Sequence, residues 1–208
     1  MVQLSVKKIV IILIIFLVVV GVAYRMSVFR ITENFYEVDS GKLYRSAQLS
    51  SDELNEYIKK YQIKTVLSLR GYPPTQILSY DTNEIENLPK MNVKFIPVDL
   101  DDNYYPSKED VKKIMQALTD GPYPILIHCR VGSDRTGMVS AMYEKFVKGK
   151  SNEEALDQLR FKYWHVRKFR PAMSEFVRKV VDKDWLMNQY NECLPEFSDL
   201  RNPEHVCK

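Results

Sequence analysis

Hydrophobic positions along the chain follow two different periods. Short strands are predicted at residues 63–69, 93–98 and 124–128, where apolar residues predominate, and at 43–48, which reads as a short strand and its exit. Segments with apolar residues three or four positions apart predict helices. These segments are residues 51–61, about 75–88, 107–120, 136–148, 151–160 and 171–190. Because strands alternate with helices, the pattern predicts an α/β fold whose central, mostly parallel sheet is flanked by helices.

The longest apolar run lies near the N-terminus and precedes this pattern. Ile9–Ala23 contains fifteen residues without a polar side chain, and as a helix it would span roughly 22 Å, less than the roughly 30 Å core of a bilayer. We expect a signal anchor, because Lys7 and Lys8 can reach the interface on one side and Tyr24 on the other.

Two other interpretations of this run stay open. The run also fits the apolar part of a cleaved signal peptide, and residues 21–23 (Gly-Val-Ala) resemble a small-residue cleavage site. A buried helix of a soluble domain is disfavoured because it would show a polar face. Basic residues flank both ends of the run, so the charge rule barely decides its orientation. Export of the C-terminal portion is the default expectation for an early anchor.

Composition narrows the classes of protein. The 30 basic and 27 acidic residues give a net charge of +3, without the clustered basic surplus that nucleic-acid binding requires, so no nucleic-acid partner is expected. Hydrophobic residues at 45% and charged residues at 27% exclude a largely disordered chain. Three cysteines are too few for a disulfide scaffold and lack the spacing of a zinc site.

The candidate chemistry lies in one loop between a strand and a helix. The apolar strand at 124–128 ends in His128-Cys129, five residues follow, and Arg135-Thr136 then opens the next helix. Such a loop directs backbone N–H groups and a helix N-terminus toward one point, which predicts an anion site. The same groups favour the thiolate of Cys129, a nucleophile aimed at a bound phosphate. Arg135 can hold two phosphate oxygens with its planar guanidinium.

Other loop residues complete the predicted phosphate site. Gly132 permits a positive φ in the tight loop, and the Thr136 hydroxyl can donate to the cysteine sulfur. Together with Arg135, the predicted phosphate-binding residues are Arg130, Val131, Gly132, Ser133, Asp134 and Thr136.

The segment resembles the loop of the protein tyrosine phosphatase superfamily, in which His-Cys is followed by five residues, Arg and Ser or Thr. The resemblance covers about residues 36–190, and residues 43–48 (Leu-Tyr-Arg-Ser-Ala-Gln) are similar to the first strand of small, bacterial dual-specificity-like phosphatases. It implies a two-step phosphomonoester hydrolysis with Cys129 as nucleophile and Arg135 as phosphate ligand. It implies no metal and no cofactor.

The resemblance also implies a general acid on a separate loop, about thirty residues before the cysteine. The usual register after Ile96-Pro97 places the acid at Leu100, which cannot serve. We expect Asp101 to be the acid, with Asp102 next and Asp99 also on this loop.

Asp134 is a rival for this role. It lies inside the phosphate loop, and Gly-x-Asp-Arg-Thr resembles loops of phosphoinositide-active phosphatases. Those relatives often carry a lysine where this chain has Ser133, although Arg130 supplies a nearby cation. The alternative is that Asp134 orients Arg135 or caps the helix.

These observations predict three parts of the chain: residues 1–30 as signal anchor or signal peptide with a connector, 31–191 as a tyrosine or dual-specificity-type phosphatase domain, and 192–208 as an irregular tail. We expect a single-pass membrane protein that acts on a phosphorylated protein. A phosphoinositide or inositol-phosphate phosphatase is the first alternative, and a weakly catalytic phosphate-binding module is the second.

The two remaining cysteines, Cys193 and Cys207, lie in the tail. If the domain is exported, an oxidising compartment favours a bridge between them, which would stabilise the fold by roughly 3 kcal/mol in the chain-entropy model. If the domain is cytosolic, both are expected to be free thiols.

Overall fold

The computed structural model describes residues 6–71 and 84–207 and divides the chain into two units, Met1–Glu33 and Asn34–Lys208. The helix expected at about 75–88 therefore lies mostly outside the described residues.

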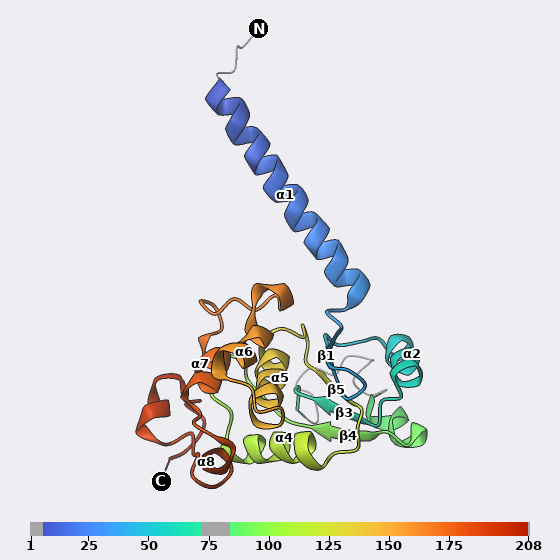
Figure 1. Ribbon diagram of the computed structural model, residues 1–208, viewed down its shortest axis with the longest axis vertical. Helices are drawn as coiled ribbons and strands as arrows, with labels where there is room; N and C mark the ends of the chain where they lie inside the picture. Colours follow the sequence, from blue (N-terminus) through green and yellow to red (C-terminus); the bar gives the residue numbers. More distant parts are fainter. Residues whose placement is uncertain (1–5, 72–83, 208) are drawn as a thin grey trace. The chain divides into compact units, whose positions relative to one another are not determined.

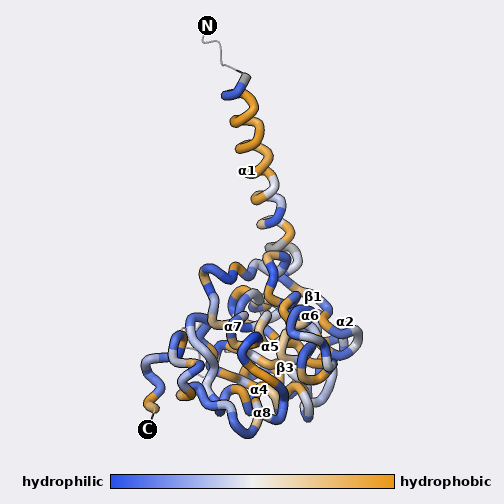
Figure 2. Tube along the Cα trace, turned by 60° about the vertical axis from the view of Figure 1, so that its left-hand side comes forward, coloured by the Kyte–Doolittle hydropathy of each residue, from blue (hydrophilic) through white to orange (hydrophobic). Residues whose placement is uncertain are grey.

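The first unit is built on one long helix, α1 (Val6–Thr32). Within it, the 22 residues Lys7–Val28 are long and apolar enough to cross a membrane, although a signal sequence would pass the same test. The helix is longer than the expected 9–23 run because Tyr24, Arg25 and the residues after them continue it. At 1.5 Å per residue the 22-residue span reaches about 33 Å, which matches a bilayer core. Figure 2 shows most of this helix in the colour of hydrophobic residues.

The second unit contains a five-stranded sheet in the order β1-β2-β5-β3-β4 (Figure 1). Its strands are β1 (Tyr36–Asp39), β2 (Leu43–Ser46), β3 (Thr65–Ser68), β4 (Lys94–Pro97) and β5 (Ile125–His128). β1 pairs antiparallel with β2, and all other pairs are parallel. The mostly parallel α/β sheet is therefore confirmed, and it also has an antiparallel edge strand, β1, that the hydrophobic pattern did not predict.

The register of the parallel strands brings their carboxyl ends together. Ser46 of β2, His128 of β5, Ser68 of β3 and Pro97 of β4 are aligned across the sheet. The loops that leave these strands consequently start at one edge. In open α/β sheets this carboxyl edge is where ligands bind.

Helices cover both faces of the sheet, because successive strand residues point to opposite sides. Leu43, Leu67 and Ile125 face a core formed with α4 (Lys108–Asp120), α5 (Asp134–Phe146) and α7 (Pro171–Lys179). Their neighbours Tyr44, Val66 and Leu126 face a smaller core with α2 (Ser51–Tyr61). The capping pairs expected before α2 and α4 are present at Ser50 and Ser107.

Two expected helices are shorter than their patterns indicated. The helix expected at 171–190 is divided into α7 and α8 (Lys183–Asn188), because Val180 is extended and the Asp182 side chain caps a new helix by accepting from Trp185 N at 2.8 Å. The helix expected at 151–160 is α6 (Asn152–Ala155) followed by a tighter 3-10 turn. In both cases a local hydrogen bond or turn replaces the continuous helix that apolar spacing alone suggested.

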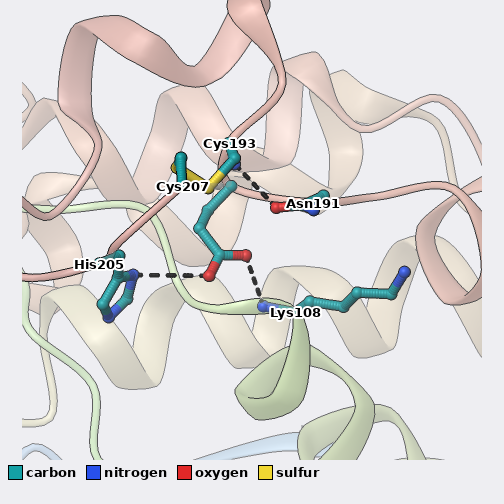
Figure 3. The surroundings of a disulfide bond; sticks show 6 residues. Lys108, Asn191, Cys193, His205 and Cys207 are labelled. Carbon is teal, nitrogen blue, oxygen red and sulfur yellow. Dashed lines mark hydrogen bonds and ion pairs between the residues drawn. A yellow bond between two sulfur atoms is a disulfide. The ribbon is translucent and has the colours of Figure 1, made fainter.

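The C-terminal tail contains a short 3-10 helix, Pro195–Leu200, whose Phe197 is fully buried against the main core. Beyond it, Cys207 forms a disulfide with Cys193, with the two Cα atoms 5.5 Å apart (Figure 3). The pairing expected for an exported domain is therefore present.

Candidate active site

The loop between β5 and α5 is shaped by a glycine. Gly132 has φ +71°, and a Cβ built there would lie 2.5 Å from Ala47 N and from Ser46 C and O. Only glycine lets the loop approach the end of β2 this closely. The N–H of Gly132 donates to Cys129 Sγ at 3.2 Å.

Two buried side chains donate hydrogen bonds to the carbonyl oxygens of the loop. Asn34 Nδ2 donates to Val131 O at 3.0 Å and to Gly132 O at 3.1 Å. Arg45 Nη2 donates to Gly132 O at 2.8 Å, and its guanidinium lies 3.9 Å from the centre of the Tyr163 ring. Because these bonds occupy carbonyl oxygens, the loop keeps the orientation that turns Gly132 N–H toward the sulfur.

Burial lowers the pKa of Arg45 to about 10, so the side chain remains cationic at neutral pH. Its Nη1 donates to both oxygens of Gln158, at 2.8 Å each. A fully buried guanidinium is costly unless its hydrogen bonds are satisfied. These contacts make Arg45 a fixed positive charge beneath the loop.

Cys129 is 2% exposed at the floor of the loop. Burial opposes ionisation of its thiol, but the charge of Arg135 and hydrogen bonding to Thr136 and Val131 outweigh it and lower the pKa of Cys129 below its ordinary value. We attribute most of this effect to Arg135 and to backbone N–H groups, because the buried Thr136 hydroxyl makes no well-aligned hydrogen bond within the described residues. The sulfur is thus prepared to be a thiolate.

Hydrogen bonds from one terminal nitrogen to two backbone carbonyl oxygens hold the guanidinium of Arg135 in place. Its Nη1 donates to Leu69 O at 3.0 Å and to Leu100 O at 3.1 Å. Its Nε is buried and has no hydrogen-bond partner among the described residues. A buried donor without a partner is costly, and a bound oxyanion would remove that cost.

A cleft of about 540 Å³ opens beside this arginine at the carboxyl edge of the sheet. Its size falls within the roughly 300–1,000 Å³ of small-molecule sites. The described residues that line it come from four regions, namely the loop after β3, the acidic loop with the start of α4, the phosphate loop and the C-terminal tail. They are Arg70, Asp99, Leu100, Asp101, Asp102, Tyr104, Tyr105, Pro106, Ser107, Asp110, Arg130, Arg135, Asn202, Glu204 and His205.

The three aspartates of the acidic loop all line the cleft, but their surroundings differ. Asp101 is exposed, and its Oδ1 accepts from both nitrogens of Asn103 at 2.8 Å. Asp102 forms an ion pair with Arg170 at 3.0 Å. Leu100, which occupies the register expected for the acid, is buried and contributes its carbonyl to Arg135.

Asp134 is separate from these aspartates. Its Oδ1 lies 2.7 Å from Nδ1 of His165, which is buried, and Asp134 is not among the described residues that line the cleft. The Asp134 carboxylate, at the start of α5, therefore contacts His165, whereas Arg135 is held by backbone carbonyls and α5 has no side-chain cap, so the alternative roles of orienting Arg135 or capping the helix are not what the structure shows.

A second buried ionic pair flanks the loop on the other side. His128 Nε2 lies 3.4 Å from Glu84 Oε2. Burial alone would lower the pKa of His128, but its interaction with the Glu84 carboxylate outweighs burial and raises that pKa. Glu84 also accepts from Gln48 Nε2, and Gln48 Oε1 accepts from Arg70 Nη1 at 2.8 Å. This chain of contacts runs from the phosphate loop to a cationic residue of the cleft.

Sequence reasoning missed several residues of this site. Asn34 lies in a segment without periodicity, and no signal in the sequence identifies it. Arg45 was visible within the Tyr-Arg-Ser strand, where a charged residue in a buried strand could have indicated a structural cation. The tail residues Asn202 and His205 also line the cleft, although the tail was expected to be irregular.

Fold and site together define a phosphatase-type α/β protein, with a buried cysteine in an anion-binding loop between a parallel strand and a helix. The sequence model of the tyrosine phosphatase family matches residues 30–158, more than half of the chain. The chain belongs to the tyrosine phosphatase family.

Relatives of known name agree with this assignment. The chain is 27% identical over 136 residues to the dual specificity protein phosphatase TpbA of Pseudomonas aeruginosa, which covers 61% of this chain and 53% of TpbA. The chain thus spans about half the length of the curated relatives it matches. A crystal structure of P. aeruginosa TpbA superimposes with TM-score 0.58 at 25% identity, covering 75% of this chain and 89% of that one.

A second solved structure shares the fold. It is the core catalytic domain of the PP-IP phosphatase SIW14 from S. cerevisiae, with TM-score 0.57 and 24% identity over 72% of this chain and 86% of that one.

Proposed function

We propose that the protein hydrolyses phosphate monoesters of proteins, phosphotyrosine first, through a cysteinyl-phosphate intermediate. The observation that carries the proposal is the pairing of Cys129 with Arg135. A buried thiol whose pKa is lowered lies beside a guanidinium that is held in place and whose Nε has no hydrogen-bond partner within the described ranges 6–71 and 84–207. That combination offers a nucleophile and an oxyanion ligand at one point.

In the first step, the Cys129 thiolate attacks phosphorus, the S–P bond forms and the P–O ester bond breaks. The departing oxygen takes a proton from an acid. In the second step, water attacks phosphorus and gives up a proton to the same carboxylate, while the S–P bond breaks and returns the thiolate. Arg135 and other backbone N–H groups of the loop stabilise the charge on the phosphoryl oxygens in both steps, while the Gly132 N–H donates to the sulfur.

We assign the acid to Asp101. It is exposed on the cleft wall, whereas Asp102 is engaged by Arg170 and Asp134 by His165. An acid must release and recover a proton in each cycle, which a carboxylate committed to an ion pair does less readily. The exposed position of Asp101 supports this role.

The charge of the cleft favours a phosphoprotein over a phosphoinositide. The described wall carries three arginines, Arg70, Arg130 and Arg135, and the acidic residues outnumber them: Asp99, Asp101, Asp102, Asp110 and Glu204. Additional phosphates on an inositol ring would meet these carboxylates and be repelled. TpbA, the relative named as a dual specificity protein phosphatase, supports the same substrate class.

We further propose that α1 anchors the protein in a membrane and that the phosphatase unit faces an oxidising compartment. The length and composition of Lys7–Val28 support an anchor. The disulfide between Cys193 and Cys207 supports export, because such bonds are rare in reducing compartments. Detection of the mature N-terminal sequence in membrane fractions tests the anchor against a cleaved signal peptide, in which residues 1–23 would be missing.

A phosphate-release panel tests the function. The purified chain is given phosphotyrosyl peptides, phosphoseryl peptides and short-chain phosphoinositides, and we expect the highest kcat/KM on phosphotyrosyl peptides. Cys129→Ser should abolish turnover on all of them while still binding inorganic phosphate, because the loop and Arg135 remain. Turnover of that variant within tenfold of wild type would contradict the mechanism, and higher kcat/KM on phosphoinositides would transfer the assignment to lipids.

The acid is tested by leaving-group dependence. Asp101→Asn should lower turnover far more on phosphotyrosyl peptide than on an activated aryl phosphate, whose leaving oxygen needs no proton. Asp102→Asn and Asp134→Asn serve as matched controls. An equal loss on both substrates for Asp101→Asn would exclude Asp101, and the variant that shows the unequal loss would take its place.

A further inference from the structure

The C-terminal tail forms part of the wall of the cleft that contains Arg130 and Arg135. Asn202, Glu204 and His205 line the same 540 Å³ space as the two arginines. These three residues follow the 3-10 helix of the tail, Pro195–Leu200, whose Phe197 belongs to the core. Residues 202–205, which we call the tail wall, are therefore placed to contact a substrate that extends along the cleft from a phosphate bound at the loop.

The chain just before the tail wall is firmly held. Phe197 is fully buried, Leu200 O accepts from Tyr105 N at 2.9 Å, and Asp199 pairs with Lys179 at 2.8 Å. On the other side, the Glu192 carboxylate accepts from Lys108 N, at the start of α4, at 2.9 Å. These contacts fix both the beginning of the tail wall and the segment that the bridge attaches it to.

The tail wall itself has few ties to the domain. Within the described part of the chain, its hydrogen bonds are internal: His205 N donates to Asn202 O at 3.1 Å, and Glu204 N donates to Asn202 Oδ1 at 3.0 Å. His205 Nδ1 approaches Glu192 Oε1 only to 3.6 Å, beyond normal hydrogen-bond length. The remaining link is the disulfide from Cys207 to Cys193 (Figure 3).

We infer that the tail wall is a substrate-specificity element, and that the Cys193–Cys207 bridge positions Asn202 and His205 to contact the peptide that flanks the phosphorylated residue. The inference rests on the proposed function. A wall that the disulfide already holds in one conformation loses less conformational entropy when the peptide binds. It therefore binds the peptide more tightly than a flexible wall would. A small aryl phosphate has no flanking peptide for the wall to contact, so its hydrolysis should depend little on the wall.

A peptide fits this wall better than a second phosphate group. Glu204 adds a carboxylate to a rim that already contains four aspartates, so the surface beyond the phosphate is suited to polar or basic side chains and backbone amides. Asn202 offers both a donor and an acceptor for such amides. The wall thus selects among phosphopeptides by their flanking residues.

The test compares wild type with the double variant Cys193→Ser plus Cys207→Ser, in the full chain in mild detergent. The substrates are p-nitrophenyl phosphate and a phosphotyrosyl peptide with basic residues on both sides. We expect KM for the peptide to rise about five- to tenfold, the loss of one or two polar contacts, with kcat for the peptide and both constants for the aryl phosphate within about twofold of wild type. Because both cysteines are replaced, Cys129 is not exposed to a reductant.

Three further variants keep the bridge intact. Asn202→Ala and His205→Ala should each raise KM for the peptide more than KM for the aryl phosphate. Val206→Ser is the matched control, because Val206 lies between the wall residues and Cys207, is 82% exposed and does not line the cleft; its kinetics should equal those of wild type.

The outcomes separate the inference from the proposed function. A wild-type chain that hydrolyses neither substrate contradicts the proposed function. If wild type hydrolyses both, equal effects of the double variant on peptide and aryl phosphate, or no effect on either, overturn the role of the wall. If the double variant fails to fold, unchanged peptide KM in both Asn202→Ala and His205→Ala overturns it, and an increase in either supports it.

Discussion

Replacement of Gly132 by alanine tests how the phosphate loop is shaped. Gly132 has φ +71°, and an added Cβ would lie 2.5 Å from backbone atoms of Ser46 and Ala47, whereas ordinary contacts begin at 3.4 Å. The loop would have to withdraw from β2 by about 0.9 Å. Overpacking of this kind costs roughly 1–3 kcal/mol, and a side chain in the left-handed region costs a further roughly 1–2 kcal/mol.

Gly149→Ala provides the matched control. Gly149 has φ +72°, but a Cβ there meets no atom within 4 Å. In both variants the alanine adopts a left-handed conformation and the unfolded chain loses entropy. The difference between their unfolding free energies therefore measures only the close contact of the new Cβ with Ser46 and Ala47. We expect Gly132→Ala to be less stable than Gly149→Ala by about 2 kcal/mol.

The assay is thermal denaturation of both variants, followed by circular dichroism. For a domain of this size, about 2 kcal/mol corresponds to a Tm that is roughly 4–8 °C lower. Withdrawal of the loop also lengthens the 3.2 Å contact from Gly132 N to Cys129 Sγ, so the pKa of Cys129 should rise toward its ordinary value. A Tm for Gly132→Ala within about 2 °C of that for Gly149→Ala would refute the reasoning.

Three other predictions concern charge and thiol state. The rate of Cys129 alkylation by iodoacetamide, followed against pH, should have its midpoint below the ordinary thiol pKa of 9.0, because Arg135 stabilises the thiolate. Arg135→Met should move that midpoint to higher pH. Equal midpoints in the two proteins would exclude this role of Arg135. Protein taken from cells under an alkylating quench should show one thiol per chain when denatured without reductant, because Cys193 and Cys207 are bonded, and three thiols would contradict the bridge. Arg45→Met should lower stability by about 2–4 kcal/mol, since it leaves buried carbonyl groups unpaired; a change in unfolding free energy below about 0.5 kcal/mol would show that the buried cation is dispensable.

The order of strands and helices could be predicted because it depends on local patterns. Strand β5 lies in a short apolar run, and α2 and α4 each carry an apolar stripe and a cap, at Ser50 and Ser107. The predicted bounds of a helix are wrong where local sequence preference and tertiary packing compete. The 171–190 segment has helical spacing throughout, yet Asp182 caps a new helix and Val180 is extended between α7 and α8.

The acid illustrates a limit of spacing arguments. Counting along the loop reached Leu100, whose side chain is buried and whose carbonyl binds Arg135. Asp99, Asp101 and Asp102 all line the cleft, and what engages each carboxylate depends on partners that spacing does not reveal. Arg170 engages Asp102, and His165 engages Asp134, so the distinction among candidates required the folded chain.

The sequence by itself determined the α/β class, the apolar N-terminal helix and the loop that joins Cys129 to Arg135, because each of these is encoded by residues that are close together along the chain. Only the tertiary structure decided what surrounds that loop. Asn34 reaches Gly132 across 98 positions and Arg45 reaches it across 87, and the tail wall enters the cleft from the opposite end of the domain. Such contacts follow from how strand ends and packed helices converge in space, and no local pattern specifies which distant residues will meet.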